Sequence, residues 1–156
     1  MDNNVYWQLV GYTGGNTWMN RQVSYWTGAD VNHVGIRFYG TQAGHPVDLY
    51  HGIISGPEEI RSGVLNRIYT PVYESSLRLS FAAGYRQARN LAANYPSGKP
   101  LHVYTHHFLG VPRTPPPTCT RMTSEILEMF GYPVSEKFLP GKLISEFNER
   151  YEQCKS

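Results

Sequence analysis

The chain has 156 residues, a net charge of +2 at neutral pH, 12 tyrosines and 11 prolines. This length fits one compact domain, so we expect residues 1–156 to form a single unit with its own core. The small net charge and the absence of any run of Lys and Arg argue against a nucleic-acid-binding protein. No apolar run is long enough to cross a bilayer.

The N-terminal residues MDNNVYWQLV lack the basic flank and long apolar core of a secretory signal peptide. We therefore expect a cytoplasmic protein, in which thiols stay reduced. The two cysteines, Cys119 and Cys154, could pair in principle, but a reducing compartment argues against a disulfide. Cys154 lies in a polar tail two residues from the end of the chain, and we interpret it as an ordinary free thiol.

The first part of the chain predicts strands joined by glycine-containing turns. Residues 5–12 are rich in aromatic and β-branched side chains, which is typical of a strand. Residues 16–25 follow two glycines and predict a short helix. Residues 33–39 alternate between apolar and polar side chains and predict a strand, and residues 47–53 predict another. Because only a short loop separates these two strands, we expect them to form a hairpin.

The second part of the chain mixes helices and strands. Residues 57–73 predict a short helical turn and a strand, and residues 80–94 have helical spacing that ends before a Pro-Ser-Gly stop. Residues 101–108 predict a further strand. Residues 119–130 form a strong amphipathic pattern that ends at a glycine, and residues 142–153 predict a last helix. The predicted fold class is α+β, with an antiparallel sheet packed against helices.

The segment PPPTCTRMTSEILEMF places a cysteine at the start of a helix. Three prolines cannot continue a helix and Thr118 is a good N-cap residue, so Cys119 falls in the first turn. The spacing to Met122 and Ile126 turns Cys119 toward the sheet. At that position the helix dipole favours the reactive thiolate, and free backbone N–H groups can hold an oxyanion. The alternative is a buried, inert cysteine that belongs to the core.

A nucleophilic cysteine needs a base, and His33 is the histidine best placed to be one. It begins a predicted strand, and Gly35 on the same face leaves room for a helix end to approach. If the hairpin loop is symmetric about Gln42, His33 lies opposite His51, which could then orient its ring. A register shift of one residue would give this orienting role to Asp48 instead. The alternative for each histidine is an ordinary hydrogen-bonded or solvent-facing side chain.

These segments together resemble the circularly permuted papain-like hydrolases, a superfamily that holds NlpC-type cell-wall peptidases and lecithin:retinol acyltransferase-like enzymes. ADVNHVGIRF resembles the strand that carries the family's histidine, VDLYHGI the next strand with a third polar residue, and TCTRMTSEILEMFGYP the nucleophile helix. The resemblance covers about residues 5–133. It implies a permuted papain-like fold in which Cys119 is the nucleophile, His33 the base and His51 the third catalytic residue.

The resulting hypothesis is a cysteine-dependent hydrolase that cleaves an amide (peptide or isopeptide) or ester bond through an acyl-enzyme, with acyltransferase activity also open. Its substrate would be a peptide, a protein conjugate or a lipid, and the reaction needs no metal or organic cofactor. One alternative is a non-catalytic binding domain that retains the papain-like cleft. Another is a zinc site formed by Cys119 with His33, His51 and either His106 or His107, although no short paired-ligand spacing supports it.

Overall fold

The computed structural model describes residues 4–14, 31–52, 56–96 and 118–152. Their strands are β1 (Asn4–Gly14), β2 (His33–Tyr39), β3 (Val47–Gly52), β4 (Gly56–Arg61), β5 (Tyr69–Glu74) and β6 (Arg78–Phe81). Their helices are α2 (Ser62–Leu65), α3 (Ala82–Ala93), α5 (Cys119–Met129) and α6 (Pro140–Phe147), and α6 continues into the π-helical turn η1 (Asn148–Glu152). None of these helices combines the length and the hydropathy that a membrane crossing requires.

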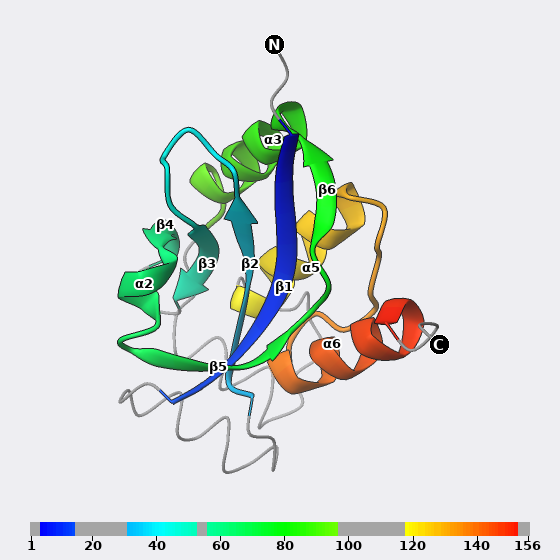
Figure 1. Ribbon diagram of the computed structural model, residues 1–156. Coiled ribbons are helices and arrows are strands. Elements are labelled where there is room, and N and C mark those ends of the chain that lie inside the picture. The colour runs from blue at the N-terminus through cyan, green and yellow to red at the C-terminus, as the bar shows by residue number, and fades with distance from the viewer. Residues whose placement is uncertain (1–3, 15–30, 53–55, 97–117, 153–156) are drawn as a thin grey trace.

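All six strands belong to one antiparallel sheet, and the fold is α+β as predicted (Figure 1). The strand order is β4-β3-β2-β1-β5, and β6 also pairs with β1. The long central strand β1 therefore has β2 along one side and two shorter strands along the other. On that second side, β6 pairs with residues 4–7 of β1 and β5 pairs with residues 10–14.

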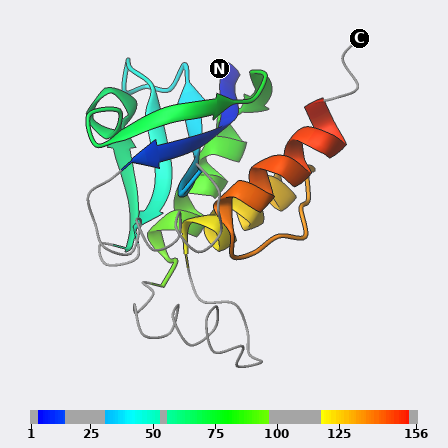
Figure 2. The same ribbon diagram turned by 90° about the horizontal axis from the view of Figure 1, so that it is seen from below.

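Helices α3, α5 and α6 lie together on one side of the sheet, which we call the helix face (Figure 2). Alternate side chains of β1 and β2 point toward these helices because successive residues of a strand face opposite ways. The core between the layers contains Val5, Trp7 and Leu9 from β1, Val34, Ile36 and Phe38 from β2, and Met122, Ile126, Leu127, Leu143 and Phe147 from the helices. This burial supplies the main driving force that holds α5 against the sheet.

The opposite side of the sheet, the outer face, carries a buried polar network. The Nε of Arg37 pairs with Oδ1 of Asp48 at 2.8 Å, and the hydroxyls of Tyr12 and Ser62 also donate to this carboxylate. One terminal nitrogen of Arg37 donates to the Tyr12 hydroxyl at 2.9 Å and to Asn66 Oδ1 at 3.0 Å. Because each charge has several partners, the ion pair is tolerated at almost complete burial.

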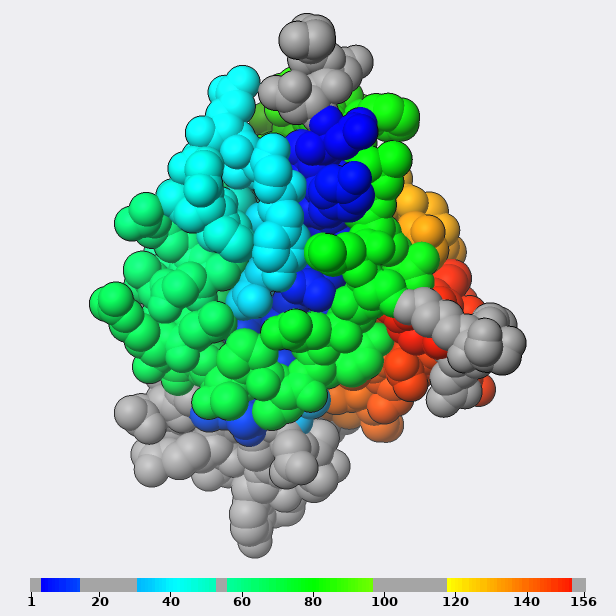
Figure 3. Space-filling model, viewed as in Figure 1, coloured from blue at the N-terminus to red at the C-terminus, as the bar shows by residue number. Residues whose placement is uncertain are grey.

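Elsewhere the outer face is less covered. Tyr6 on β1 and Leu79 on β6 are paired across the strands, and both are exposed, as is Phe81 at the end of β6. Figure 3 shows this region of β1 in blue between neighbouring strands at the molecular surface.

The predicted hairpin of β2 and β3 is confirmed, but the predicted register is wrong by one residue. Gly35 pairs with Tyr50 and Ile36 with Leu49, so His33 does not lie opposite His51. The observed register keeps the apolar side chains of both strands on the helix face. The predicted one would have turned Leu49 to the face of His33 and away from the core.

The helix predicted over residues 80–94 begins at Ala82, because residues 78–81 form the short strand β6 that the helical spacing concealed. The helix predicted over 119–130 is confirmed as α5. The predicted last helix corresponds to α6 and η1. The helix predicted over 16–25 and the strand predicted over 101–108 lie outside the described residues.

Candidate active site

The cysteine-bearing helix begins as the sequence predicts. Cys119 is the first residue of α5, and the Thr118 side chain accepts a hydrogen bond from the Arg121 backbone N–H at 3.4 Å. The Thr118 carbonyl accepts the first helical bond, from the Met122 N–H at 3.0 Å. The cap thus uses the N–H groups of Arg121 and Met122, while those of Cys119 and Thr120 are left at the head of the helix.

The Cys119 thiol is buried against the sheet, and its residue is 9% exposed. Burial raises the pKa of the thiol, and hydrogen bonding from the Val34 main chain and from the hydroxyl and main chain of Thr120 offsets the rise only in part. Desolvation thus opposes the effect that we expect of the helix terminus, and it keeps the pKa of the thiol above its usual value. The resting sulfur is a neutral thiol.

His51 lies on the same face of the sheet as Cys119. Because Gly35 pairs with Tyr50, continuing the register places His51 across from Val34. Val34 belongs to the core of the helix face, and its main chain reaches the Cys119 sulfur. The structure therefore places Cys119 and His51 on the same face of the sheet, both next to Val34.

The hydrogen bonding of His51 defines its tautomer. Its Nε2 lies 2.7 Å from the carbonyl oxygen of Pro96, and a carbonyl can only accept a hydrogen bond. Burial lowers the pKa of His51, so the ring is neutral and Nε2 carries its single proton. The unprotonated atom is then Nδ1, which is buried and has no hydrogen-bond partner among the described residues.

His33 lies on the outer face instead. Its ring stacks on Tyr69 with centroids 4.6 Å apart, and the rings of Tyr50 and Tyr12 lie at 5.1 and 6.0 Å. Burial, followed by electrostatic repulsion from His51, lowers the pKa of His33 to about 3. The prediction that His33 and His51 share a face is wrong, because the strand register differs from the expected one.

Asp48, the other candidate for an orienting residue, also lies on the outer face. Its carboxylate is bound by Arg37, Tyr12 and Ser62, and no hydrogen bond joins it to His33. Asp48 therefore stabilises the buried arginine rather than orienting a histidine.

The supporting roles of Pro96, Tyr95 and Glu125 were missed in the sequence. Pro96, interpreted only as a helix stop, holds the His51 ring through its carbonyl. The Tyr95 ring contacts His51 edge to face with centroids 5.7 Å apart, and its hydroxyl donates to Glu125 on α5. The Arg121 guanidinium lies 3.9 Å from the Glu125 carboxylate. These contacts join the end of α3 to the cysteine-bearing helix, and only tertiary structure reveals them.

Comparisons with protein-family models, with curated proteins and with solved structures find no match. No relative therefore indicates the function of the site, and its chemistry is inferred from its own residues. Within the described ranges, no group of three or more His, Cys, Asp or Glu side chains is arranged to hold a metal ion. His106 and His107, the further ligands of the zinc alternative, lie outside those ranges, as does Cys154.

Proposed function

We propose that this chain is a cysteine-dependent hydrolase that cleaves an amide or ester bond, with Cys119 as the nucleophile and His51 as the base. The observation that carries the proposal is that His51, whose Nδ1 atom is buried without a partner among the described residues, lies on the sheet face against which the Cys119 thiol packs. The roles of the two histidines are thereby exchanged relative to the sequence hypothesis, because the His33 ring stacks on Tyr69 at the outer face of the sheet.

The proposed reaction starts from a neutral pair. The His51 Nδ1 atom accepts the proton of the Cys119 thiol as the sulfur attacks the substrate carbonyl carbon. The tetrahedral intermediate then breaks its bond to the leaving group, which takes the proton from His51. A thioester on Cys119 remains. Water, deprotonated by His51, attacks the thioester and releases the acid and the free thiol, which regains the proton.

The head of α5 supplies the groups for the developing oxyanion. The backbone N–H groups of Cys119 and Thr120 are not used by the helix cap, and both favour negative charge at the sulfur. Two N–H groups at a helix N-terminus are suited to hold the carbonyl oxygen as it becomes negative. If another nucleophile replaces water in the second step, the same residues catalyse acyl transfer.

The resemblance of the sequence to permuted papain-like hydrolases supports the same chemistry. Under this proposal the acyl donor is a peptide, an isopeptide-linked protein or a lipid ester, since each offers a carbonyl carbon with a leaving group. The reaction needs no metal and no organic cofactor.

Acylation by p-nitrophenyl acetate tests the proposal. We expect release of p-nitrophenol and an acetyl group on Cys119, located by peptide mass spectrometry, and neither in Cys119→Ala. We expect His51→Gln to slow acylation by about 100-fold, the lower range for general-base catalysis. His33→Gln should have a smaller effect.

His45→Gln is the matched control, because it removes a histidine from the turn between β2 and β3 without touching α5. Circular dichroism checks that each variant is folded. Acetylation spread equally over Cys119 and Cys154, or a rate that does not respond to His51→Gln, would contradict the proposal. No acylation at all would favour the non-catalytic binding domain.

A further inference from the structure

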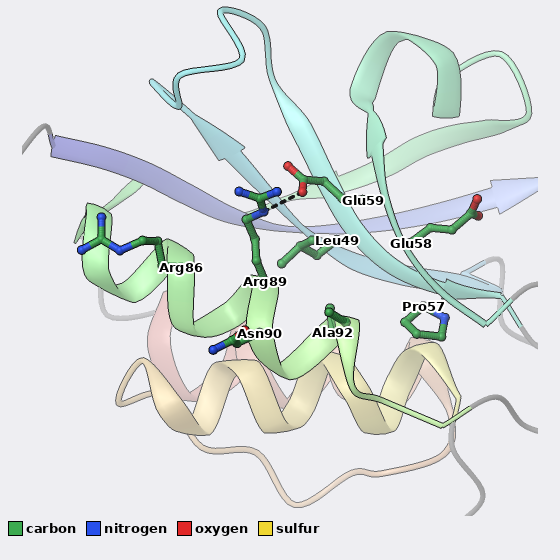
Figure 4. Close-up of a pocket in the computed structure, with 9 residues that line it drawn as sticks. Leu49, Pro57, Glu58, Glu59, Arg86, Arg89, Asn90 and Ala92 are labelled. Atoms are coloured by element: carbon green, nitrogen blue, oxygen red, sulfur yellow. Dashed lines mark ion pairs between the residues drawn. The ribbon is translucent and has the colours of Figure 1, made fainter.

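A groove runs along the side of α3 that faces the sheet edge. One part of it, about 430 Å³ in volume, lies between β4 and α3 (Figure 4). A second part, about 320 Å³, lies between the β2–β3 turn and the start of α3. Both parts are lined by Glu59, Arg86 and Arg89. They are therefore adjoining sections of one groove.

The two carboxylates in the groove already have donors. Arg89 Nε lies 2.8 Å from Glu59 Oε2, and the Tyr85 hydroxyl donates to the other oxygen of Glu59. The Glu58 carboxylate accepts from the Tyr50 hydroxyl at 2.5 Å, and its side chain points away from Arg89 in Figure 4. The charge of Glu59 is thus balanced by Arg89, and the Glu58 carboxylate is turned away from both arginines of the groove (Figure 4).

The guanidinium groups of Arg86 and Arg89 have N–H donors that form no hydrogen bond with the described residues. Arg86 is exposed at the rim shared by both sections, and it forms no ion pair or hydrogen bond with any described residue. Arg89 pairs through Nε with Glu59, and its two terminal nitrogens form no hydrogen bond with any other described residue. Planar guanidinium groups bind carboxylates through two parallel hydrogen bonds. The groove is therefore suited to a ligand that brings a carboxylate.

One end of the groove lies beside the candidate active site. Pro57, which lines the groove, is the cross-strand partner of His51. Ala92 and Ala93 line the groove from the end of α3. Pro96, three residues after Ala93, accepts a hydrogen bond from His51. A chain that leaves Cys119 along this groove would pass Pro57 first and the two arginines next.

We propose that the groove binds an acidic segment of the substrate, with separate carboxylates held by Arg86 and by Arg89. The inference rests on the proposed function, because it makes the substrate of Cys119 a peptide with an acidic side chain. Arg86 and Ala93 are about 10 Å apart along α3, at the usual rise of a helix. An extended peptide covers this distance in about three residues. The acidic residue therefore lies at least about three residues from the scissile bond.

Binding to the Cys119→Ala protein tests the inference without any turnover. The probes are two capped peptides, acetyl-hexaglutamate amide and acetyl-hexaglutamine amide, and the measurement is isothermal titration calorimetry at low salt. We expect the glutamate peptide to bind more tightly. Replacing Arg86 with Gln should weaken that binding roughly fivefold, the upper range for an exposed ion pair.

Arg67→Gln is the matched control, because Arg67 is exposed in the turn after α2. Its replacement changes the net charge of the chain by the same amount as Arg86→Gln. Equal affinity for the two peptides, or equal losses in Arg86→Gln and Arg67→Gln, overturns the inference. Acylation by p-nitrophenyl acetate is measured separately on the unaltered chain. If acylation fails while Arg86-dependent binding persists, the proposed reaction is overturned and the groove stands as an acidic-peptide site.

Discussion

His33 makes the stability of the folded chain depend on pH. Its residue is 3% exposed, and its Nε2 atom has no hydrogen-bond partner within the described ranges. Burial and repulsion from His51 lower its pKa from 6.5 to about 3. The unfolded chain therefore binds a proton at His33 that the folded chain rejects. The stability that depends on neutral His33 is present above pH 6.5 and is lost progressively as the pH falls toward 3.

The size of the effect follows from the two pKa values. Below the unfolded-state pKa, each unit by which the pH falls lowers the free energy of unfolding by about 1.4 kcal/mol for one proton. Between pH 7.5 and 5.0, His33 alone should lower the free energy of unfolding by about 2 kcal/mol. This pH range avoids most of the carboxylate titration, which lies lower. His51, whose pKa is also lowered by burial, adds a loss of the same sign.

Urea denaturation at pH 7.5 and pH 5.0, followed by circular dichroism, measures the difference. His33→Phe keeps an aromatic ring against Tyr69 and removes the titrating group. We expect the pH-dependent loss to shrink by about 2 kcal/mol in this variant. The matched control is His45→Gln, which should leave the loss unchanged. An equal loss in His33→Phe and in the unaltered chain would refute the description of His33 as a buried neutral base.

Three further predictions concern the buried ion pair, the helix cap and the thiol. Asp48→Asn leaves Arg37 buried without its charge partner, and should lower the free energy of unfolding in urea by about 3 to 5 kcal/mol. Replacing both residues together, by Arg37→Met with Asp48→Leu, should recover much of this loss, whereas a more severe loss would contradict the reasoning. Thr118→Ala removes the cap of α5 and should cost about 1 kcal/mol in the same assay. Because burial raises the pKa of the Cys119 thiol, iodoacetamide at pH 7 should alkylate it more slowly in the native chain than in the denatured one. Faster native alkylation would contradict the neutral thiol.

The start of α5 could be predicted because its signals are local. Three prolines and the cap residue Thr118 act within a few residues of Cys119, whatever the rest of the chain does. The pKa of the thiol could not be predicted in the same way, since it depends on how deeply the sheet buries the sulfur. The local signals therefore predicted the helix but not the effect of burial on the pKa of the thiol.

The register of the hairpin was open to a better prediction. Val34, Ile36 and Phe38 alternate along β2, and His51 shares the alternation of Leu49 along β3. Packing both apolar sets on one face places His51 on that face and His33 on the other, as observed. Assuming a symmetric loop instead gave a register one residue away. Pro96 and the arginine-lined groove could not be predicted, because each depends on segments that meet only in the folded chain.

A buried, neutral Cys–His pair places a particular demand on the substrate. Because burial raises its pKa, the Cys119 thiol is protonated at neutral pH and is a weak nucleophile by itself. In the proposed reaction its proton moves to His51 only when a carbonyl carbon is held within reach of the sulfur, so positioning has to come from binding elsewhere on the substrate. A groove that begins at Pro57, beside His51, and carries unused guanidinium donors on α3 can provide that binding. The two proposals therefore depend on each other. The Cys119 thiol and His51 would react with any carbonyl carbon held beside them, and binding in the groove would determine which substrate places its carbonyl there.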